Sequence, residues 1–375
     1  MLNKAFALVL LAAAPIMAQV KYAGLNMPGF EFGCQPDEEA GEMWGGSCDL
    51  SRVYAPEDIW TRQMNHFVQD SKLNAFRIPV TWQYLVWNQL GQPVNDTSAA
   101  TYERIIQACL NAGAALCMID FHNFARYDSE VIGQGGPSDQ DFASIWGQIA
   151  TRYATEERVA FNIMNEPYDL DISTWANTMQ AAVDAIRNAG ATSQMILLPG
   201  ANFTSAREFL NSGSGDALNS IQNPDGTKNG LVFDVHQYLD GNGSGGEGVC
   251  TVPDPTGIFR DLTQWLKDNG RQAFLTEIGG GDDSSCYDQV CQVFDHLNEN
   301  SKQYLGWLGW GAGSLTPPNI LSEVPIQNGN RLEDVELVKR CIAGKFGNSA
   351  SLNGTCSGAS LNSTSKRTVR ARLRR

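Results

Sequence analysis

Two glutamates each follow directly after a short apolar run, Glu166 after FNIMN and Glu277 after AFLT. Burying a carboxylate against apolar side chains is costly, so an acid in such a place has either a structural partner or a chemical task. Two carboxyl groups that face one another can cleave a glycosidic bond, because one protonates the leaving oxygen while the other attacks or activates water. The structural alternative is that each glutamate caps a following helix or forms a salt bridge.

Eight short runs rich in β-forming residues alternate with segments of helical periodicity. The predicted strands are residues 20–27, 74–80, 115–122, 159–166, 195–201, 231–238, 272–279 and 304–313. The predicted helices are residues 58–71, 98–112, 139–155, 172–189, 256–269 and 286–300, with only short helical pieces around 205–220. This alternation predicts an α/β fold with a parallel sheet, and eight units fit a (β/α)₈ TIM barrel. A doubly wound open sheet is the alternative, since alternation does not show closure.

Polar side chains cluster at the carboxyl ends of these predicted strands. They are Asn26, Arg77, His122, Asn165, Glu166, His236, Tyr238, Glu277 and Trp310. In a barrel all of these ends face the same mouth, where active sites lie. For any single residue a solvated loop position is an equally good interpretation, and the convergence of so many strand ends carries the prediction.

The other polar residues at the mouth have matching tasks. Arg77 can keep a neighbouring carboxylate ionised, because an adjacent cation lowers a carboxyl pKa. His236 and Tyr238 are two residues apart on a strand, so they share a face, and His122 can bind sugar hydroxyls or orient a carboxylate. Only 4 histidines are present, and a three-histidine metal site would need nearly all of them from separate strands. We therefore expect no metal and no cofactor.

Aromatic residues lie just beyond several strands. Sugars offer apolar faces, so aromatic platforms are expected along a glycan cleft. The aromatic candidates are Trp82, Tyr84, Trp87, Phe203 and Trp310. Core packing is the plainer interpretation for each of them, but Trp82, Tyr84 and Trp87 follow the RIPV strand end, which favours the cleft.

The two ends of the chain differ from its body. Residues 1–18 have the charge, apolar stretch and small final residue of a secretory signal peptide, so we expect a secreted, extracellular protein. Residues 19–346 are predicted to form one domain, and residues 347–375 a Ser/Asn/Gly-rich, then basic, disordered tail. The formal net charge of −14 argues against nucleic acid, and no later segment is apolar enough to span a membrane.

The 9 cysteines of a secreted chain favour disulfides over metal sites. Proximity in sequence suggests the pairs Cys34–Cys48 and Cys109–Cys117. Two more bridges are expected among Cys250, Cys286, Cys291 and Cys341, with their pairing left open and Cys356 left over. N-glycosylation sequons stand at Asn95, Asn202, Asn242, Asn353 and Asn362.

Several longer motifs are similar to those of a known family. They are RIPVTWQYL (77–85), DFHNFARY (120–127), IGQGGP (132–137), NIMNEP (162–167), FDVHQYLD (233–240), LTEIGGG (275–281) and GWLGWGAGS (306–314). From about Lys21 to about Ile342 the chain resembles fungal endo-β-1,4-glucanases of glycoside hydrolase family 5. The resemblance implies a secreted barrel enzyme of the retaining type (an endo-1,4-β-glucanase or cellulase) that takes a β-glucan polysaccharide as its substrate. We expect it to act as a monomer.

The resemblance also implies roles at matching positions. Glu166 matches the acid/base, Glu277 the nucleophile, and Asn165 the residue that hydrogen-bonds the sugar 2-hydroxyl. The remaining site residues of the family are matched by Arg77, His122, His236, Tyr238 and Trp310. We add Asn26 and Trp82 as candidate substrate-binding residues, because Asn26 lies at the end of a predicted strand and Trp82 just beyond one. Two departures stand out: Phe203 lies where fungal relatives often have tryptophan, and the segment between Cys34 and Cys48 is long and acidic. The rival hypotheses are a family 5 hydrolase of another β-glycan (mannan, xyloglucan or mixed-linkage glucan) and a non-catalytic glycan-binding protein.

Overall fold

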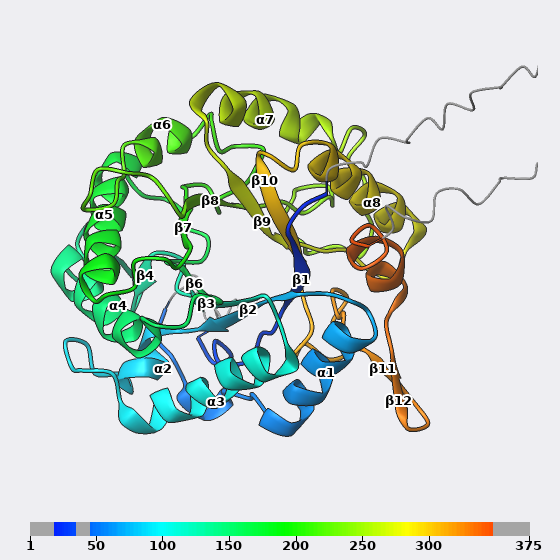
Figure 1. Ribbon diagram of the computed structural model, residues 1–375, viewed down its shortest axis with the longest axis horizontal. Coiled ribbons are helices and arrows are strands. Elements are labelled where there is room, and N and C mark those ends of the chain that lie inside the picture. Colours follow the sequence, from blue (N-terminus) through cyan, green and yellow to red (C-terminus); the bar gives the residue numbers. More distant parts are fainter. Residues whose placement is uncertain (1–18, 35–45, 348–375) are drawn as a thin grey trace, which may run out of the picture.

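Eight parallel strands close into a barrel that a ring of helices surrounds (Figure 1). The computed structural model describes residues 19–34 and 46–347. The barrel strands are β1 (Tyr22–Asn26), β2 (Ala75–Val80), β3 (Leu116–Phe121), β6 (Val159–Asn162), β7 (Ile196–Pro199), β8 (Leu231–His236), β9 (Ala273–Ile278) and β10 (Tyr304–Gly309). Each pairs in parallel with its sequence neighbour and β10 pairs with β1, so the predicted barrel is confirmed and the open sheet is excluded.

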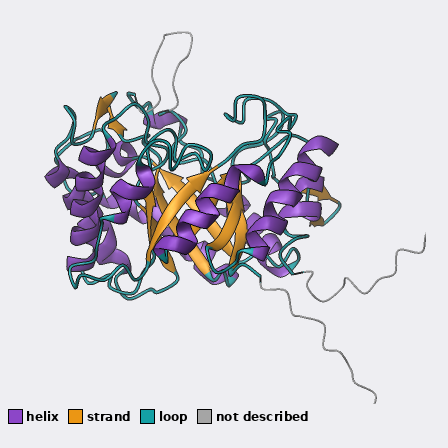
Figure 2. Cartoon of the chain, turned by 90° about the horizontal axis from the view of Figure 1, so that it is seen from above, coloured by secondary structure: helices purple, strands orange, loops and turns teal. Residues whose placement is uncertain are grey.

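The outer layer follows the predicted helical segments. Its helices are α1 (Glu57–Gln69), α2 (Trp82–Val86), α3 (Asp96–Ala112), α4 (Asp139–Tyr153), α5 (Ile172–Asn188), α6 (Ser214–Asn219), α7 (Gly257–Asn269) and α8 (Ser284–Glu299). Of these, α2 is an additional short helix that was not predicted. Polar side chains begin several of them: Asn95 accepts hydrogen bonds from the first turn of α3, and Ser138 and Asp141 form a capping box on α4. Seen from the side, the helices flank the strands and loops fill both ends (Figure 2).

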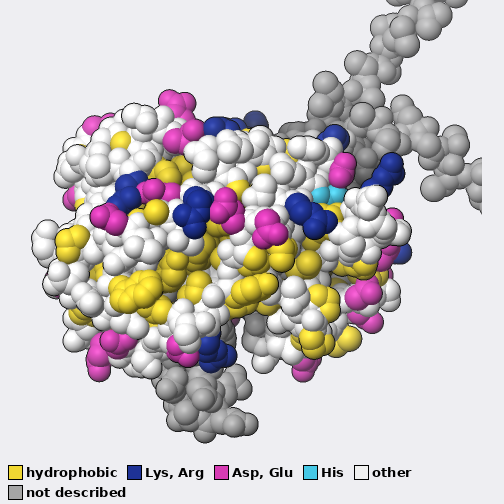
Figure 3. Space-filling view, turned by 90° about the horizontal axis from the view of Figure 1, so that it is seen from below, with side chains coloured by type: hydrophobic (Ala, Val, Ile, Leu, Met, Phe, Trp, Pro, Cys, Tyr) yellow, Lys and Arg dark blue, Asp and Glu magenta, His cyan; other side chains and the backbone are white. Residues whose placement is uncertain are grey.

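Smaller elements decorate this frame. They are the short helices η2 (Leu50–Arg52) and η3 (Val338–Ile342) and two antiparallel pairs, β4 (Arg126–Tyr127) with β5 (Glu130–Val131) and β11 (Ile326–Asn328) with β12 (Arg331–Glu333). The face that carries α1, α2 and α3 has hydrophobic side chains gathered below a row of alternating basic and acidic ones (Figure 3). Every helix among the described residues is too short or too polar to cross a bilayer.

The barrel interior is built in layers. Nine apolar side chains fill its lower part: Tyr22, Ala75, Leu116, Met118, Ala160, Leu197, Val232, Phe274 and Leu308. Side chains alternate along a strand, so two residues further on each strand point inward again. Those next positions hold Arg77, Asp120, Asn162, Asp234 and Thr276, and Asn26 lies four residues beyond Tyr22; all six are fully buried. A polar layer therefore lies between the apolar layer and the mouth.

Four disulfides link the described cysteines. The bridges Cys34–Cys48 and Cys109–Cys117 are confirmed. The pairing that the sequence left open is Cys250–Cys286 and Cys291–Cys341. The predicted signal peptide, Cys356, the basic tail and the sequons at Asn353 and Asn362 lie outside the described residues, as does most of the acidic segment before Cys48.

The fourth barrel strand is shorter than expected. Its prediction ran to Glu166, but β6 ends at Asn162. Beyond that point the backbone N–H of Asn165 donates to the carbonyl of Phe121 on β3 (2.7 Å), and Glu166 takes a left-handed conformation with φ 41°. Ile163 also donates its N–H to the Leu197 carbonyl of β7 (3.3 Å), so single backbone hydrogen bonds to both neighbouring strands continue beyond the end of β6. Glu166 lies on the loop that follows.

Candidate active site

Glu277 lies near the carboxyl end of β9, next to a guanidinium and a phenol. Arg77 Nη1 donates to its Oε1 (2.5 Å), and the Tyr238 hydroxyl donates to its Oε2 (3.0 Å). The Glu277 carboxyl is 5 % exposed. Burial raises the pKa of Tyr238 well above its usual value, so the phenol keeps its proton and stays a donor. Both partners stabilise the ionised form of Glu277.

Glu166 faces a neutral imidazole instead. Its Oε1 lies 2.7 Å from His236 Nδ1, and its side chain is 17 % exposed. Burial and the positive charge of Arg77 lower the pKa of His236 well below its ordinary value, so the ring carries no charge. This environment gives Glu166 no cationic partner of its own, and it leaves the carboxyl open to the mouth.

The two carboxyl groups lie close together. One carboxylate oxygen of each, together with a ring nitrogen of His236, falls within a 4.8 Å cluster. Burial raises the pKa of both groups, and the neighbouring charge of Glu277 raises the pKa of Glu166 further. Arg77 opposes this rise at Glu277, which it contacts directly. Glu166 therefore takes the first proton of the pair, and Glu277 is the group that ionises.

Arg77 is the centre of the polar layer. Besides Glu277 it contacts Asp120 (Nη2 to Oδ1, 2.9 Å), and it donates to Asn162 (Nε to Oδ1, 2.6 Å) and Asn165 (Nη2 to Oδ1, 2.6 Å). The Asn165 Nδ2 is buried and makes no hydrogen bond within the described chain. Arg77 thus fixes the oxygen of Asn165 and turns its N–H donors toward other partners.

His122 and Trp310 form an aromatic corner of the site. His122 Nδ1 bonds Asp120 Oδ2 (2.8 Å), and its ring stacks on Trp310 with centroids 5.3 Å apart and 13° between the planes. Trp310 is half-buried and leaves the end of β10 with its backbone N–H on the carbonyl of Ile278. The indole therefore has one face supported and part of its surface open.

Two predicted substrate contacts lie elsewhere. Asn26 is fully buried: its Nδ2 donates to Thr276 and Gly309 carbonyls, and its Oδ1 accepts from Arg77 (3.0 Å), so it positions Arg77 beneath the mouth. Trp82 is 1 % exposed and packs against Tyr127 and Phe142, because α2 turns it toward α4. The interpretation of Trp82 as a cleft platform is wrong.

The other aromatic candidates divide in the same way. Tyr84 is buried against Phe30, whereas Trp87 and Phe203 are exposed. Phe203 stacks on Tyr168 with centroids 4.9 Å apart and 7° between the planes. The residues before and after Phe203 share its left-handed backbone conformation, which presents the ring on the rim after β7.

Sequence reasoning missed the polar layer below the carboxyls. Asp120, Asn162 and Thr276 lie within hydrogen-bond reach of predicted site residues, and Asp234 accepts hydrogen bonds from Asn162 and Thr276. A signal was present: Asp120 precedes His122 by two residues and Asp234 precedes His236 by two. Residues two apart on a strand share a face, so each aspartate points into the barrel below its histidine.

Glu166, His236 and Glu277 also have the donor types of a metal site. Each side chain already has a partner: His236 Nδ1 lies on Glu166, and the Arg77 guanidinium lies on Glu277. A fixed positive charge in direct contact with one carboxylate disfavours a cation there. Proton transfer explains the same three groups without a metal.

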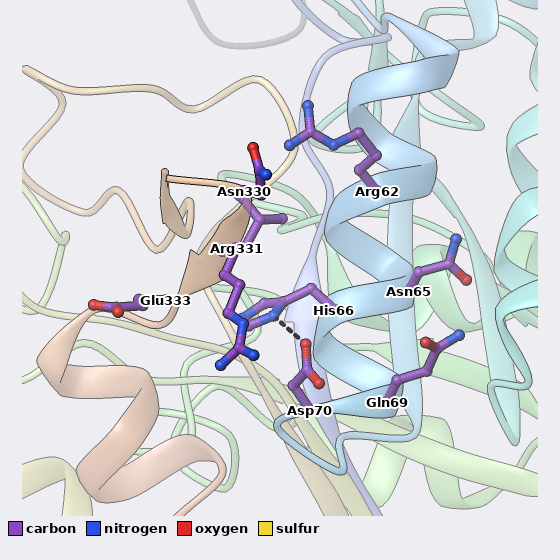
Figure 4. Close-up of a pocket in the computed structure, with 9 residues that line it drawn as sticks. Arg62, Asn65, His66, Gln69, Asp70, Asn330, Arg331 and Glu333 are labelled. Carbon is purple, nitrogen blue, oxygen red and sulfur yellow. Dashed lines mark hydrogen bonds and ion pairs between the residues drawn. The ribbon is translucent and has the colours of Figure 1, made fainter. Parts of the chain in front are cut away.

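A pocket of about 780 Å³ lies away from the mouth, between α1 and the β11–β12 hairpin (Figure 4). His66 lines it, but both of its ring nitrogens are bonded, Nδ1 to Asp70 (2.9 Å) and Nε2 to Asp334 (2.8 Å). Its arginines, Arg62 and Arg331, point from opposite sides of the pocket. No paired acids or aromatic surface lie among the residues that line it, so the barrel mouth is the better candidate site.

Comparison with known proteins decides the family. The sequence pattern of the cellulases, described as glycosyl hydrolase family 5, matches residues 34–313. The chain belongs to glycosyl hydrolase family 5. This family 5 chain is 47 % identical to endoglucanase EG-II of Hypocrea jecorina, over 87 % of the chain and 78 % of that protein. It is 40 % identical to endoglucanase 1 of Saitozyma flava, over 84 % of the chain and 88 % of that protein.

A solved structure shows the same fold for this family 5 chain. The crystal structure of Cel5A (EG2) from Hypocrea jecorina superposes with a TM-score of 0.83 at 46 % identity, covering 87 % of the chain and 99 % of that protein. The matched pattern, residues 34–313, spans Glu166, Glu277 and Trp310. The predicted family and fold are confirmed.

Proposed function

We propose that the protein is a secreted retaining endo-β-1,4-glucanase that hydrolyses internal β-1,4-glucosidic bonds of cellulose and related β-glucans. The observation that carries this proposal is the pair Glu166 and Glu277, because one carboxylate oxygen of each lies within 4.8 Å of the other. Retaining enzymes need carboxyl groups about 5–5.5 Å apart, whereas inverting enzymes need roughly 6.5–9.5 Å to admit a water molecule. The named relatives, both called endoglucanases, support the substrate class.

In the first step Glu277 attacks the anomeric carbon while Glu166 gives its proton to the leaving oxygen. The C–O bond to the leaving sugar breaks as the bond to Glu277 forms, and the leaving chain departs as an alcohol. Arg77 and Tyr238 keep Glu277 ionised for this attack. Because its pKa is raised, Glu166 stays protonated and can give its proton to the leaving oxygen.

In the second step Glu166 acts as a base. It takes a proton from a water molecule, whose oxygen attacks the same anomeric carbon and releases Glu277 as a carboxylate. Glu166 is protonated again, and the sugar keeps its original configuration after two inversions. In the covalent intermediate the charge of Glu277 is gone, which removes one cause of the raised Glu166 pKa and lets Glu166 serve as the base.

The surrounding side chains fit a glucan chain in the mouth. The unpaired Nδ2 of Asn165 can donate to a sugar hydroxyl beside the reacting carbon. Trp310 offers a supported indole face for one sugar, and Phe203 offers a ring on the rim for another. Asn202 is exposed next to Phe203, so a glycan there would narrow the rim, while the sequons at Asn95 and Asn242 lie on other loops.

The test is an assay of reducing-end release from soluble cellulose derivatives, mixed-linkage glucan, xyloglucan and mannan. The wild-type protein is compared with Glu166→Gln and with Glu299→Gln, which makes the same change on the exposed side of α8. We expect β-1,4-glucans to be cut fastest, Glu166→Gln to lose roughly 10²–10⁴-fold in kcat, and Glu299→Gln to match wild type.

Faster cleavage of mannan or xyloglucan would move the proposal to another β-glycan. Binding of glucan with no rise in reducing ends would support a binding protein instead. Wild-type activity in Glu166→Gln would contradict the proposed acid/base. Measurement of the particle size of the secreted protein would test whether it is a monomer.

A further inference from the structure

Asp234 receives two hydrogen bonds from opposite sides of the polar layer. It lies on β8, fully buried beneath His236. Asn162 Nδ2 donates to its Oδ2 (2.8 Å), and the Thr276 hydroxyl donates to its Oδ1. An ionised carboxylate can only accept, so the two chains of hydrogen bonds that lead to Asp234 must both point toward it.

The first chain begins at Arg77, which has no acceptor. Arg77 Nε donates to Asn162 Oδ1 (2.6 Å), so the amide of Asn162 is oriented with its oxygen toward Arg77. Its NH₂ group is then left to face Asp234. The orientation of the amide therefore follows from a residue whose role as a donor cannot change.

The second chain runs from Asp234 to the surface of the site. Thr276 has a single proton, and because it gives that proton to Asp234 its oxygen must accept from His236 Nε2 (2.9 Å). A neutral imidazole with its proton on Nε2 has a lone pair on Nδ1. The Glu166 oxygen 2.7 Å from Nδ1 must then carry a proton and donate it.

We propose that Asp234 and Thr276 are positioning residues that fix the tautomer of His236 and thereby hold the proton on Glu166 between turnovers. This inference rests on the proposed role of Glu166 and explains how that role is maintained. Neither residue touches the substrate. They act through His236, whose ring nitrogens face Thr276 on one side and Glu166 on the other.

The protons balance through both steps of the reaction. Three hydrogen bonds join the four groups of the second chain, and each has one hydrogen: from Glu166 to His236, from His236 to Thr276, and from Thr276 to Asp234. When Glu166 gives its proton to the leaving oxygen, its carboxylate faces the lone pair of Nδ1. That repulsion favours the return of a proton from the attacking water, and the other two hydrogens do not move.

Arg77 and two hydrogen bonds favour the ionised form of Asp234, whereas burial and the negative charge of Asp120 oppose it. Arg77 faces it from β2, Asp120 from β3 and Thr276 from β9, while His236 Nε2 on its own strand lies 3.7 Å away. Burial raises the pKa of Asp234 to about 6, and the charge of Arg77 and the hydrogen bonds from Thr276 and Asn162 oppose a larger rise. Above that pH Asp234 is the acceptor that the chain requires.

Asp234→Asn is expected to reverse the second chain. Because Arg77 orients Asn162, the new amide must place its oxygen toward Asn162 and its NH₂ toward Thr276. Thr276 then donates to His236 Nε2, and the ring proton moves to Nδ1, where it stabilises the Glu166 carboxylate. Thr276→Val removes the oxygen that accepts the Nε2 proton of His236, so the ring proton can again move to Nδ1. Thr276→Ser keeps this oxygen.

The test combines a pH profile with nitrogen NMR of the histidine ring. For Asp234→Asn and Thr276→Val we expect the alkaline limb of kcat/KM to move down by about one pH unit or more. In the same variants the proton of His236 should move from Nε2 to Nδ1 in the ¹⁵N spectrum of the free enzyme. Thr276→Ser should keep both readouts near wild type.

Thr263→Val is the matched control. Thr263 is also buried and also bonds a histidine, His296 Nε2 (3.0 Å), but on the outer side of the barrel. Its loss should lower the melting temperature and leave both readouts unchanged. The proposal would be overturned if both Asp234→Asn and Thr276→Val kept the wild-type alkaline limb of kcat/KM and kept the His236 proton on Nε2. The NMR signal needs no substrate, so this failure is distinguishable from inactivity of the Glu166 site.

Discussion

At the scale of single residues, Arg77 makes the environments of the two glutamates, Glu166 and Glu277, different. It donates directly to Glu277, while Glu166 meets only the neutral ring of His236. The same guanidinium orients Asn162 and Asn165. One cation at the centre of the barrel thus favours the ionised form of Glu277 and orients the two asparagine amides beside it.

A third buried carboxyl, Glu31, gives a prediction about stability. It lies just beyond β1, accepts the Gly29 N–H at Oε2 (2.7 Å), and has an Oε1 with no hydrogen-bond partner among the described residues. Burial raises its pKa to about 8 from 4.5. The folded protein keeps this proton where the unfolded chain has released it, so stability should fall as the pH rises from about 4.5 to about 8.

Glu31→Gln removes this titration and keeps the shape of the side chain. We expect the variant to lose less stability than wild type over that range, by about 1.4 kcal/mol per pH unit. Denaturant unfolding at several pH values measures this slope, with Glu299→Gln on the exposed side of α8 as the control. Parallel curves for Glu31→Gln and wild type would show that Glu31 is ionised in the folded protein.

The sequence revealed the upper residues of the site better than the lower ones. Glu166, Glu277 and His236 follow apolar runs and so stand out at strand ends. Asp234 and Thr276 lie inside such runs, where a single polar residue between apolar neighbours reads as an ordinary strand position. Their roles depend on which side chains of other strands meet them, and that information appears only when the barrel closes.

At the scale of elements, an irregularity between β8 and β9 lets two consecutive residues, Thr276 and Glu277, both contribute to the active site. The register of β8 against β9 shifts between Val235 and His236, so that His236 pairs with Glu277. A shift of this kind changes the alternation of side chains locally. Thr276 contacts His236 while Glu277 contacts Arg77, although neighbours on a regular strand point to opposite faces.

Element positions were predictable to different degrees. The eight strands were found because strands buried on both faces read as short apolar runs. The end of β6 was misplaced because Ile163 and Met164 are as apolar as the strand but lie beyond its end, where Ile163 keeps one backbone hydrogen bond to Leu197 on β7. Trp82 was misplaced because the turn of α2 sets its direction, and a five-residue helix leaves little periodicity in the sequence.

The bridge Cys291–Cys341 gives a prediction at this scale. It joins α8 to η3 and closes a loop of 50 residues. The double variant Cys291→Ala/Cys341→Ala should be less stable by roughly 2–4 kcal/mol, because the unfolded chain has more conformational entropy without the bridge. Denaturant unfolding measures this loss, and each single variant should lose a similar amount. Stability equal to wild type in the double variant would contradict a structural role for the bridge.

At the scale of the whole molecule, the barrel turns eight separate strand ends into one site. Arg77 and Glu277 are far apart in sequence but meet in the closed sheet, because β2 pairs with β1, β1 with β10 and β10 with β9. The apolar layer supports the polar layer, and the polar layer holds the carboxyls at the mouth. The resulting separation of Glu166 and Glu277 is a property of the closed barrel, and no local pattern in the sequence contains it.

That separation is tested most directly by the configuration of the product. A short cello-oligosaccharide is cleaved by the wild-type enzyme, and proton NMR follows the anomeric signals before the free sugars re-equilibrate. One oxygen of each carboxyl group lies within 4.8 Å of the other, which is the short separation of a retaining enzyme, so the new reducing end should first appear as the β-anomer. First appearance of the α-anomer would mean a single inversion and would contradict the proposed role of Glu277 as the nucleophile.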